Sequence, residues 1–169
     1  CKECEEIIKF AAEYKGPMYI RLARTNLIDL FDENYKFTPY KANILREGKD
    51  FTVISNGETL AEVLLAADQL AKKGIELEVI SMPVVKPIDE NTIITSAKKT
   101  GFVVTVENHS IINGLGSAVC EVLAEKFPTK VYRIGVNDKF GQSGKWTELL
   151  DFYGLTANKI ASKIEELRK

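Results

Sequence analysis

The residue types best suited to chemistry gather in one turn, residues 107–116. Glu107 and His109, the only histidine of the chain, flank this turn and are types that can serve as an acid/base pair. Glycines at positions 114 and 116 open a helical pattern, and the N–H groups of a helix N-terminus can bind an anion. No second histidine, nearby cysteine nucleophile or Gly-x-Ser-x-Gly motif completes a catalytic set. We therefore expect an interface or anion site at Glu107, His109, Gly114 and Gly116, and no catalytic residue.

The two glycines also match part of a dinucleotide-binding fingerprint. The fingerprint is incomplete, because Val119 stands where its third glycine belongs. In addition, no strand ending in an acidic residue follows at the distance that a ribose requires. The glycines have a simpler explanation, since small residues let a helix pack closely against a sheet. A stand-alone regulatory module that binds a nucleotide or another anion stays open as an alternative.

Two arginines lie at the end of an apolar segment, residues 18–23, that we interpret as a buried strand. Arg21 interrupts the apolar run, whereas Arg24 comes at its carboxyl end, where open α/β sheets bind ligands. Arginine at such a position suits a phosphate or a carboxylate. A solvated charge explains Arg24 equally well, so both interpretations stay open.

The spacing of Cys1 and Cys4 fits a redox pair or half of a zinc site. A redox pair needs a preceding strand and a zinc site needs two more ligands, and the sequence supplies neither. We therefore expect no metal site. Cys120 falls on the apolar face of a predicted helix and is interpreted as core filling.

Alternating helices and strands must position these residues. Apolar residues recur at helical spacing over residues 2–14, whereas the connecting segment 25–46 shows no sustained period. From Asp50 onward, short apolar runs alternate with helical patterns, and Asp89 and Thr156 stand at helix-capping positions. The predicted strands are 51–55, 77–82, 102–106 and 130–134, and the predicted helices are 59–73, 90–99, 114–126, 146–153 and a last one after Thr156.

Repeated βα units joined by short loops predict an α/β fold with a mostly parallel sheet covered on both faces. Residues 46–169 are long enough to form that domain. The helix and strand of residues 1–30 cannot close a core of their own. We interpret them as the tail of a preceding domain, joined to the main domain by a linker over residues 31–45.

The composition narrows the choice of partners and compartment. The formal net charge is −1 and the pI is about 6.0, which gives no sign of a nucleic-acid partner. Apolar runs stay well below the ~20 residues that cross a bilayer, so we expect no membrane partner. Three cysteines cannot all pair with one another, which favours a reducing, cytoplasmic location.

Four segments, taken in order, resemble the carboxyl-terminal part of transketolase, most closely the type whose catalytic body is divided between two polypeptides. They are GPMYIRLARTN, DFTVISNGETLAEVLLAADQLAKKGIELEVISMPVVKPID, VVTVENHSIINGLGSAVCEVLAE and RIGVNDKFGQSGKWTELLDFYGLT. The resemblance covers nearly the whole chain. It implies that residues 1–30 are the tail of a pyrimidine-binding domain. It also implies that residues 46–169 form a three-layer α/β/α domain with a mostly parallel five-stranded sheet.

The resemblance implies an activity as well. Transketolases use thiamine diphosphate and Mg²⁺ to move a two-carbon ketol unit between sugar phosphates. Their substrate-phosphate arginine, in the sequence Leu-Ser-Arg-Gln-Asn, matches Arg24, with Ala23 in place of serine and Thr25 in place of glutamine. The glutamate that activates the cofactor and the Gly-Asp-Gly magnesium motif have no counterpart here. We therefore expect this polypeptide alone to bind no cofactor and to be inactive. Its expected role is to supply interfaces in a homodimer, together with the remaining domains or a partner subunit.

The turn at residues 107–116 departs from the pattern of the family, which usually reads Glu-Glu-His followed by two glycines. Asn108 replaces one glutamate and Asn113 replaces one glycine, so nothing predicts a glycine-like backbone at residue 113. The related section of a 1-deoxyxylulose-5-phosphate synthase or of a 2-oxoacid dehydrogenase β subunit is the alternative enzyme.

Overall fold

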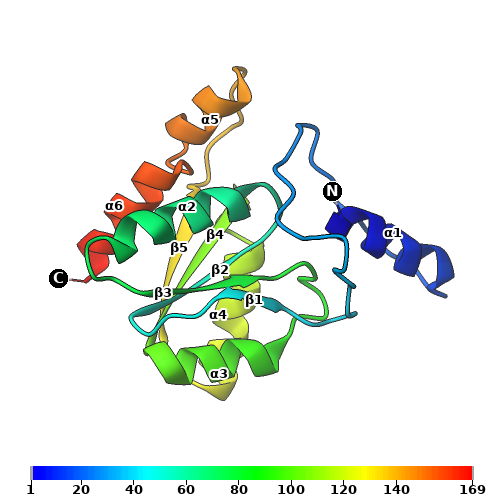
Figure 1. Ribbon diagram of the computed structural model, residues 1–169, viewed down its shortest axis with the longest axis horizontal. Helices are drawn as coiled ribbons and strands as arrows, with labels where there is room; N and C mark the ends of the chain where they lie inside the picture. The colour runs from blue at the N-terminus through cyan, green and yellow to red at the C-terminus, as the bar shows by residue number, and fades with distance from the viewer. Residues whose placement is uncertain (1, 169) are drawn as a thin grey trace. The chain divides into compact units, whose positions relative to one another are not determined.

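The computed structural model describes residues 2–168 of the 169-residue chain and divides into two compact units (Figure 1). The first unit is Cys1–Pro39 and the second is Tyr40–Lys169. The second unit holds the β-sheet, and the turn at residues 107–116 belongs to it.

The first unit has one regular element in its described residues, the helix α1 (Lys2–Glu13), which confirms the helix predicted there. The strand predicted at residues 18–23 is wrong, because this segment runs as irregular chain. Two of its large apolar side chains are exposed to solvent, Tyr19 at 88% and Leu22 at 58%. A strand is stable only where a neighbouring strand pairs with its backbone N–H and C=O groups. Residues 2–39 contain no strand that could pair with residues 18–23.

The second unit is built on a five-stranded sheet. Its strands are β1 (Asn43–Arg46), β2 (Phe51–Ser55), β3 (Leu77–Ser81), β4 (Phe102–Ser110) and β5 (Lys130–Val136). They lie in the order β1-β3-β2-β4-β5, with β1 antiparallel to β3 and the other four parallel. The predicted α/β class and its mostly parallel five-stranded sheet are therefore confirmed.

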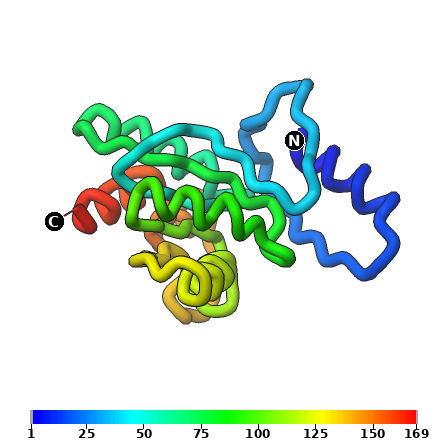
Figure 2. Tube along the Cα trace, turned by 90° about the horizontal axis from the view of Figure 1, so that it is seen from below, coloured from blue at the N-terminus to red at the C-terminus, as the bar shows by residue number. Residues whose placement is uncertain are grey.

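Helices cover both faces of this sheet (Figure 1). The helices of the second unit are the short 3-10 helix η1 (Gly57–Thr59), α2 (Leu60–Ala71), α3 (Glu90–Thr100), α4 (Leu115–Lys126), α5 (Trp146–Phe152) and α6 (Ala157–Leu167), and α5 projects away from the sheet. α2 packs beside α6 on one face, and α3 packs beside α4 on the other. Figure 2 shows the second pair from the side that it covers. The three layers α/β/α follow. In the described part of the chain, no helix combines the length and the apolarity that a membrane span requires.

The core lies on both sides of the central strands. Every residue of β2 and β3 is buried, as expected for parallel strands that have helices on two faces. On one side, Ile54 of β2 packs in a cluster that includes Ile93 of α3 and Val119 of α4. On the other side, Leu70 of α2 and Ile160 of α6 are completely buried. The helical spacings of apolar residues thus identify the inner faces correctly.

Some details of the second unit differ from the prediction, and one is that β4 runs on to Ser110 instead of ending at residue 106. The edge strand β1 lies in the segment that was expected to be irregular, because its four residues are too few to show a period. Thr156 does stand at the N-cap position of α6, but its side chain makes no capping hydrogen bond. Instead, the N–H of Ala157 donates to Oε2 of Glu62 at 2.6 Å, so that a residue of α2 caps α6.

Candidate functional site

The candidate site lies where the order of the parallel strands reverses. From β2 the chain passes through α2 to β3, towards one edge, whereas from β4 it passes through α4 to β5, towards the other. α2 and α4 therefore leave the carboxyl ends of the neighbouring strands β2 and β4 on opposite faces of the sheet. Doubly wound sheets bind ligands in the crevice that this reversal creates. The segment 107–116 lies at this place and comprises the last four residues of β4, the turn 111–114 and the start of α4.

Glu107 lies in β4 with its side chain against the start of α4. The residue is only 2% exposed. Its Oε2 accepts a hydrogen bond from the N–H of Leu115 at 2.7 Å, and its Oε1 accepts one from the N–H of Gly116 at 2.8 Å. A free helix N-terminus has unpaired N–H groups and a partial positive charge. The Glu107 carboxylate thus pairs with two N–H groups of the first turn of α4, whose N-cap residue, Gly114, has no side chain that could do so.

Gly114 and Gly116 provide the space for this arrangement. A Cβ at residue 114 would lie 2.0 Å from Oε2 of Glu107, and one at residue 116 would lie 2.7 Å from Oγ1 of Thr105. Neither glycine has a positive φ. Their role in this structure is close packing of α4 against β4, the simpler of the two explanations that the sequence allows.

The middle of the turn is held by its own backbone and by α4. Asn113 adopts the left-handed backbone, with φ of 60°, so the glycine-like conformation not expected at this position is present. Asparagine is one of the few residues other than glycine that adopt it readily. The N–H of Asn113 donates to Oγ of Ser117 at 2.9 Å. Nη1 of Arg133, on β5, donates to the carbonyl of Ile111 at 2.7 Å.

His109 lies near the end of β4, and its side chain is half-exposed. Its Nδ1 lies 2.8 Å from the carbonyl oxygen of Ser110, so Nδ1 carries the proton in that hydrogen bond. The same nitrogen is 3.9 Å from Oε2 of Glu107. Glu107 and His109 are therefore neighbours. The Glu107 carboxylate, however, already accepts two backbone hydrogen bonds and is shielded from solvent.

Two further contacts, not predicted from the sequence, join the segment that follows β2 to β4. Nδ2 of Asn108 donates to Oε2 of Glu58. Oγ1 of Thr59 donates to the carbonyl of Val106 at 3.2 Å and lies 2.9 Å from Oγ of Ser55. A polar run directly after a strand, at residues 55–59, is the signal that could have revealed them.

Arg24 lies in the first unit, in the irregular segment after residue 23, and its side chain is exposed. Arg21 is exposed as well. The expected position at the carboxyl tip of a strand is absent in this unit, since residues 18–23 form no strand. Arg24 therefore stays a candidate through its match to the transketolase sequence pattern.

The cysteines form no site in the described residues. Cys4 and Cys120 are free thiols, and Cys1 lies outside the part of the chain that the structure describes. Burial raises the pKa of the Cys120 thiol, which suits the predicted packing role. Within residues 2–168, no group of three or more His, Cys, Asp or Glu side chains lies together in a way that could hold a metal ion.

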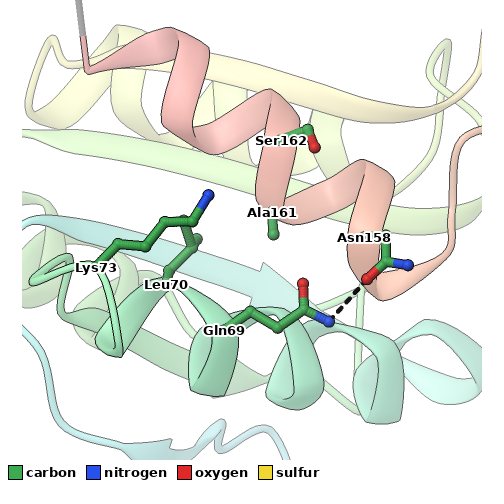
Figure 3. A pocket seen from close by; sticks show the side chains of 6 residues that line it. All are labelled: Gln69, Leu70, Lys73, Asn158, Ala161 and Ser162. Carbon is green, nitrogen blue, oxygen red and sulfur yellow. Dashed lines mark hydrogen bonds between the residues drawn. The ribbon is translucent and has the colours of Figure 1, made fainter.

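A shallow hollow of about 180 Å³ lies between α2 and α6, away from the turn at residues 107–116. Figure 3 shows Gln69 and Asn158 facing one another across it, with Nε2 of Gln69 donating to Oδ1 of Asn158 at 2.9 Å. Nζ of Lys73 pairs with Glu165 at 2.6 Å. These polar side chains pair with one another across α2 and α6, so their presence at the hollow is explained without a ligand.

Comparison with known proteins gives the same family from sequence and from structure. Residues 40–160 match the family model described as "Transketolase, C-terminal domain". A Methanocaldococcus jannaschii protein provisionally named transketolase C-terminal section is 47% identical in an alignment that covers 98% of this chain and 52% of that protein. The 6-deoxy-6-sulfo-D-fructose transketolase subunit SqwH of Clostridium sp. (strain MSTE9) is 47% identical over 91% of this chain and 48% of its own length.

A solved structure described as "Split gene transketolase, inactive beta4 tetramer" superposes with a TM-score of 0.93 and 44% sequence identity. The superposition covers 98% of this chain and 54% of that one. The chain thus spans about half the length of the relatives that it matches.

Proposed function

Because this chain belongs to the transketolase C-terminal domain family, we propose that it is the C-terminal section of a thiamine diphosphate-dependent transketolase. The complete enzyme would transfer a two-carbon ketol unit between sugar phosphates. The observation that carries the proposal is the similarity, over nearly the whole chain, to a split-gene transketolase subunit at 44% identity. In this proposal, residues 46–169 are the C-terminal domain and residues 1–30 are the tail of a pyrimidine-binding domain, with a linker between them.

In the complete enzyme, thiamine diphosphate would supply the carbanion chemistry and Mg²⁺ would neutralise its diphosphate. The described residues of this chain do not fit that metal, since they gather no cluster of suitable ligands. We therefore assign cofactor binding to the remaining domains or to a partner subunit, and interfaces in a homodimer to this section. We also propose a cytoplasmic location, where three cysteines would stay reduced.

Arg24 is the residue that we assign to substrate. A guanidinium offers two parallel N–H donors to a phosphate, and such charged pairs are among the strongest hydrogen bonds in proteins. The match of Leu22-Ala23-Arg24-Thr25-Asn26 to the pattern of the family supports this role. The named activities of relatives differ, since they include a sulfofructose transketolase and an apulose-4-phosphate transketolase subunit. For this enzyme we propose a phosphorylated sugar as substrate, whereas the sulfofructose in one relative's name carries a sulfonate instead.

Reconstitution tests the proposal. The chain would be purified alone and together with the cofactor-binding section of the same enzyme, whether that section is a separate subunit or part of a longer chain, and each would be assayed with xylulose 5-phosphate and ribose 5-phosphate. We expect ketol transfer from the combination and none from the chain alone. Calorimetry would measure thiamine diphosphate binding in parallel. Micromolar affinity or turnover by the chain alone would refute the division of labour, and a combination that is inactive with every phosphorylated ketose would refute the activity.

The same experiment separates the alternative enzymes. Relatives include a 1-deoxy-D-xylulose-5-phosphate synthase, which makes that alternative specific. A combination that condenses pyruvate with glyceraldehyde 3-phosphate, and that leaves xylulose 5-phosphate unchanged, would favour the synthase. Oxidative decarboxylation of a 2-oxoacid would favour a dehydrogenase β subunit. The remaining alternative, an anion-binding regulatory module, is opposed by the Glu107 carboxylate, which occupies the N–H groups that an anion would need.

A further inference from the structure

We infer that Glu107 is a built-in carboxylate ligand of the α4 N-terminus, and that it closes the crevice between β2 and β4 to phosphates and carboxylates from solution. The inference concerns the folded domain itself and holds whichever reaction the complete enzyme catalyses. In this proposal Glu107 excludes anions from the N-terminus of α4.

The first support is the geometry at the α4 N-terminus. The two oxygens of Glu107 accept the N–H groups of Leu115 and Gly116 at 2.7 and 2.8 Å. These are adjacent N–H groups of the first helical turn, the donors that bind phosphate in nucleotide-binding folds. Because each donor is already paired with a carboxylate oxygen, an anion from solution could bind only by displacing the side chain.

The second support is the lack of free space. A single Cβ added at residue 114 would come within 2.0 Å of Oε2 of Glu107 and 2.8 Å of Nδ1 of His109. A phosphate is much larger than a methyl group. The crevice is also bridged from the β2 side, where Asn108 bonds to Glu58 and Thr59 bonds to the carbonyl of Val106. The Glu58 carboxylate adds a second negative charge at this end of the sheet, which repels anions.

The third support is electrostatic. A buried carboxylate is costly unless hydrogen bonds or opposite charge compensate for its lost hydration. Glu107 is 2% exposed, and no Lys or Arg within residues 2–168 is recorded at ion-pair distance from its carboxylate. Its compensation comes from the two N–H donors and from the positive end of α4. The carboxylate and the helix end therefore fit one another as ligand and site.

Chemical rescue tests the inference. Glu107→Ala removes one carbon and a carboxylate group, the heavy atoms of acetate. The melting temperature of the chain would be measured by circular dichroism in sodium acetate, sodium formate and sodium chloride of equal ionic strength. The matched control is Glu121→Ala, which removes an exposed glutamate from α4. We expect Glu107→Ala to melt several degrees below wild type in chloride and to recover at least a third of that loss in acetate, with saturation. Wild type and Glu121→Ala should show no such difference between the salts.

A second measurement does not depend on the stability of the variant. In wild type, phosphate and ADP would be titrated while the amide NMR signals of Leu115 and Gly116 are followed. We expect no saturable shift of either signal up to about 10 mM ligand, a concentration on the order of ten thousand times a micromolar dissociation constant. A saturable shift would overturn the inference. So would a folded Glu107→Ala variant that acetate does not stabilise beyond the control, because the carboxylate would then act only as packing.

Discussion

Oε2 of Glu107 occupies the place where a side chain at residue 114 would begin, since a Cβ on Gly114 would lie only 2.0 Å from it. The absence of a side chain at one residue thus permits the buried carboxylate of another. Because the carboxylate completes the first turn of α4, Gly114 and Glu107 act as one unit that joins β4 to the helix after it. The importance of this close packing for stability can be measured by substituting Gly114 while Glu107 is kept.

Gly114→Ala should destabilise the second unit by about 2–3 kcal/mol, the upper part of the usual range for overpacking in a close-packed region. The alanine would push the Glu107 carboxylate away from Leu115 and Gly116. Urea denaturation followed by circular dichroism would measure the change. Gly141→Ala is the control, because no heavy atom beyond its chain neighbours lies within 4 Å of a Cβ placed there. Equal stabilities of the two variants would contradict the close packing.

Asp89→Ala should lower the free energy of unfolding by about 1–3 kcal/mol, because it removes a cap and leaves backbone donors unpaired. The Asp89 carboxylate accepts from the N–H of Thr92 at 3.2 Å and from the N–H of Ala42 at 3.1 Å. It therefore fixes both the start of α3 and the chain just before β1. Asp89→Asn, which keeps an acceptor oxygen, should lose less. A variant series in which alanine and asparagine cost the same would contradict this interpretation.

Acid should weaken the contribution of Asp89. Burial alone would raise its pKa, but hydrogen bonds from Ala42 and Thr92, with Lys41 nearby, outweigh burial and hold the pKa below its usual value near 3.8. A carboxyl with a lowered folded-state pKa stabilises the protein above its unfolded pKa and loses that effect as pH falls through the folded one. The stability difference between wild type and Asp89→Asn should thus be constant above about pH 5 and should shrink below pH 3.8. Denaturation across a pH series from neutral to acid would show whether the difference grows instead, which would be the wrong sign.

Asn113 gives a test of backbone conformation. Its φ of 60° favours glycine, so Asn113→Gly should be neutral or stabilising by a few tenths of a kcal/mol. Asn113→Val should destabilise by about 1–2 kcal/mol, because a branched side chain strains the left-handed backbone. Thermal unfolding of both variants would measure the difference. If valine were tolerated as well as glycine, the turn would not hold residue 113 in this conformation.

Arg24→Ala should raise the KM of the reconstituted enzyme for phosphorylated sugars about 10- to 100-fold, the loss expected for hydrogen bonds to a charged group. We expect a smaller change in kcat, because a remote phosphate contact binds the ground state and the transition state alike. Arg21→Ala is the matched control in the same segment and should leave the KM nearly unchanged. Steady-state kinetics would distinguish the two. Equal effects of both substitutions would remove Arg24 from the substrate site.

The strands and helices of the second unit were predictable where the local pattern and the tertiary environment agree. Residues 51–55 and 77–81 are apolar runs that the structure buries completely, and Asp89 caps α3 through the N–H of Thr92 as predicted. Residues 18–23 carry the same kind of apolar pattern but form no strand in the first unit. The difference is physical, since β-propensity describes a fit to a sheet and a sheet needs a second strand.

The candidate site was predictable only in its location. A strand followed by polar residues and glycines indicates the turn at residues 107–116, but not the direction of its side chains. The Glu107 carboxylate reaches donors eight and nine residues later, and this depends on where α4 begins relative to β4. The contact between Asn108 and Glu58 joins residues 50 positions apart. Such contacts follow from the register of β2 against β4, which no local pattern encodes.

β2 lies between β3 and β4 and is covered on both faces, so a substitution on either face would disturb buried packing. A strand with one wet face tolerates change at every second position, whereas here Thr52 and Ser55 are as enclosed as Val53 and Ile54. Sequence diversity among related chains should accordingly collect at the two rims of the sheet, with β2 and β3 the most restricted strands.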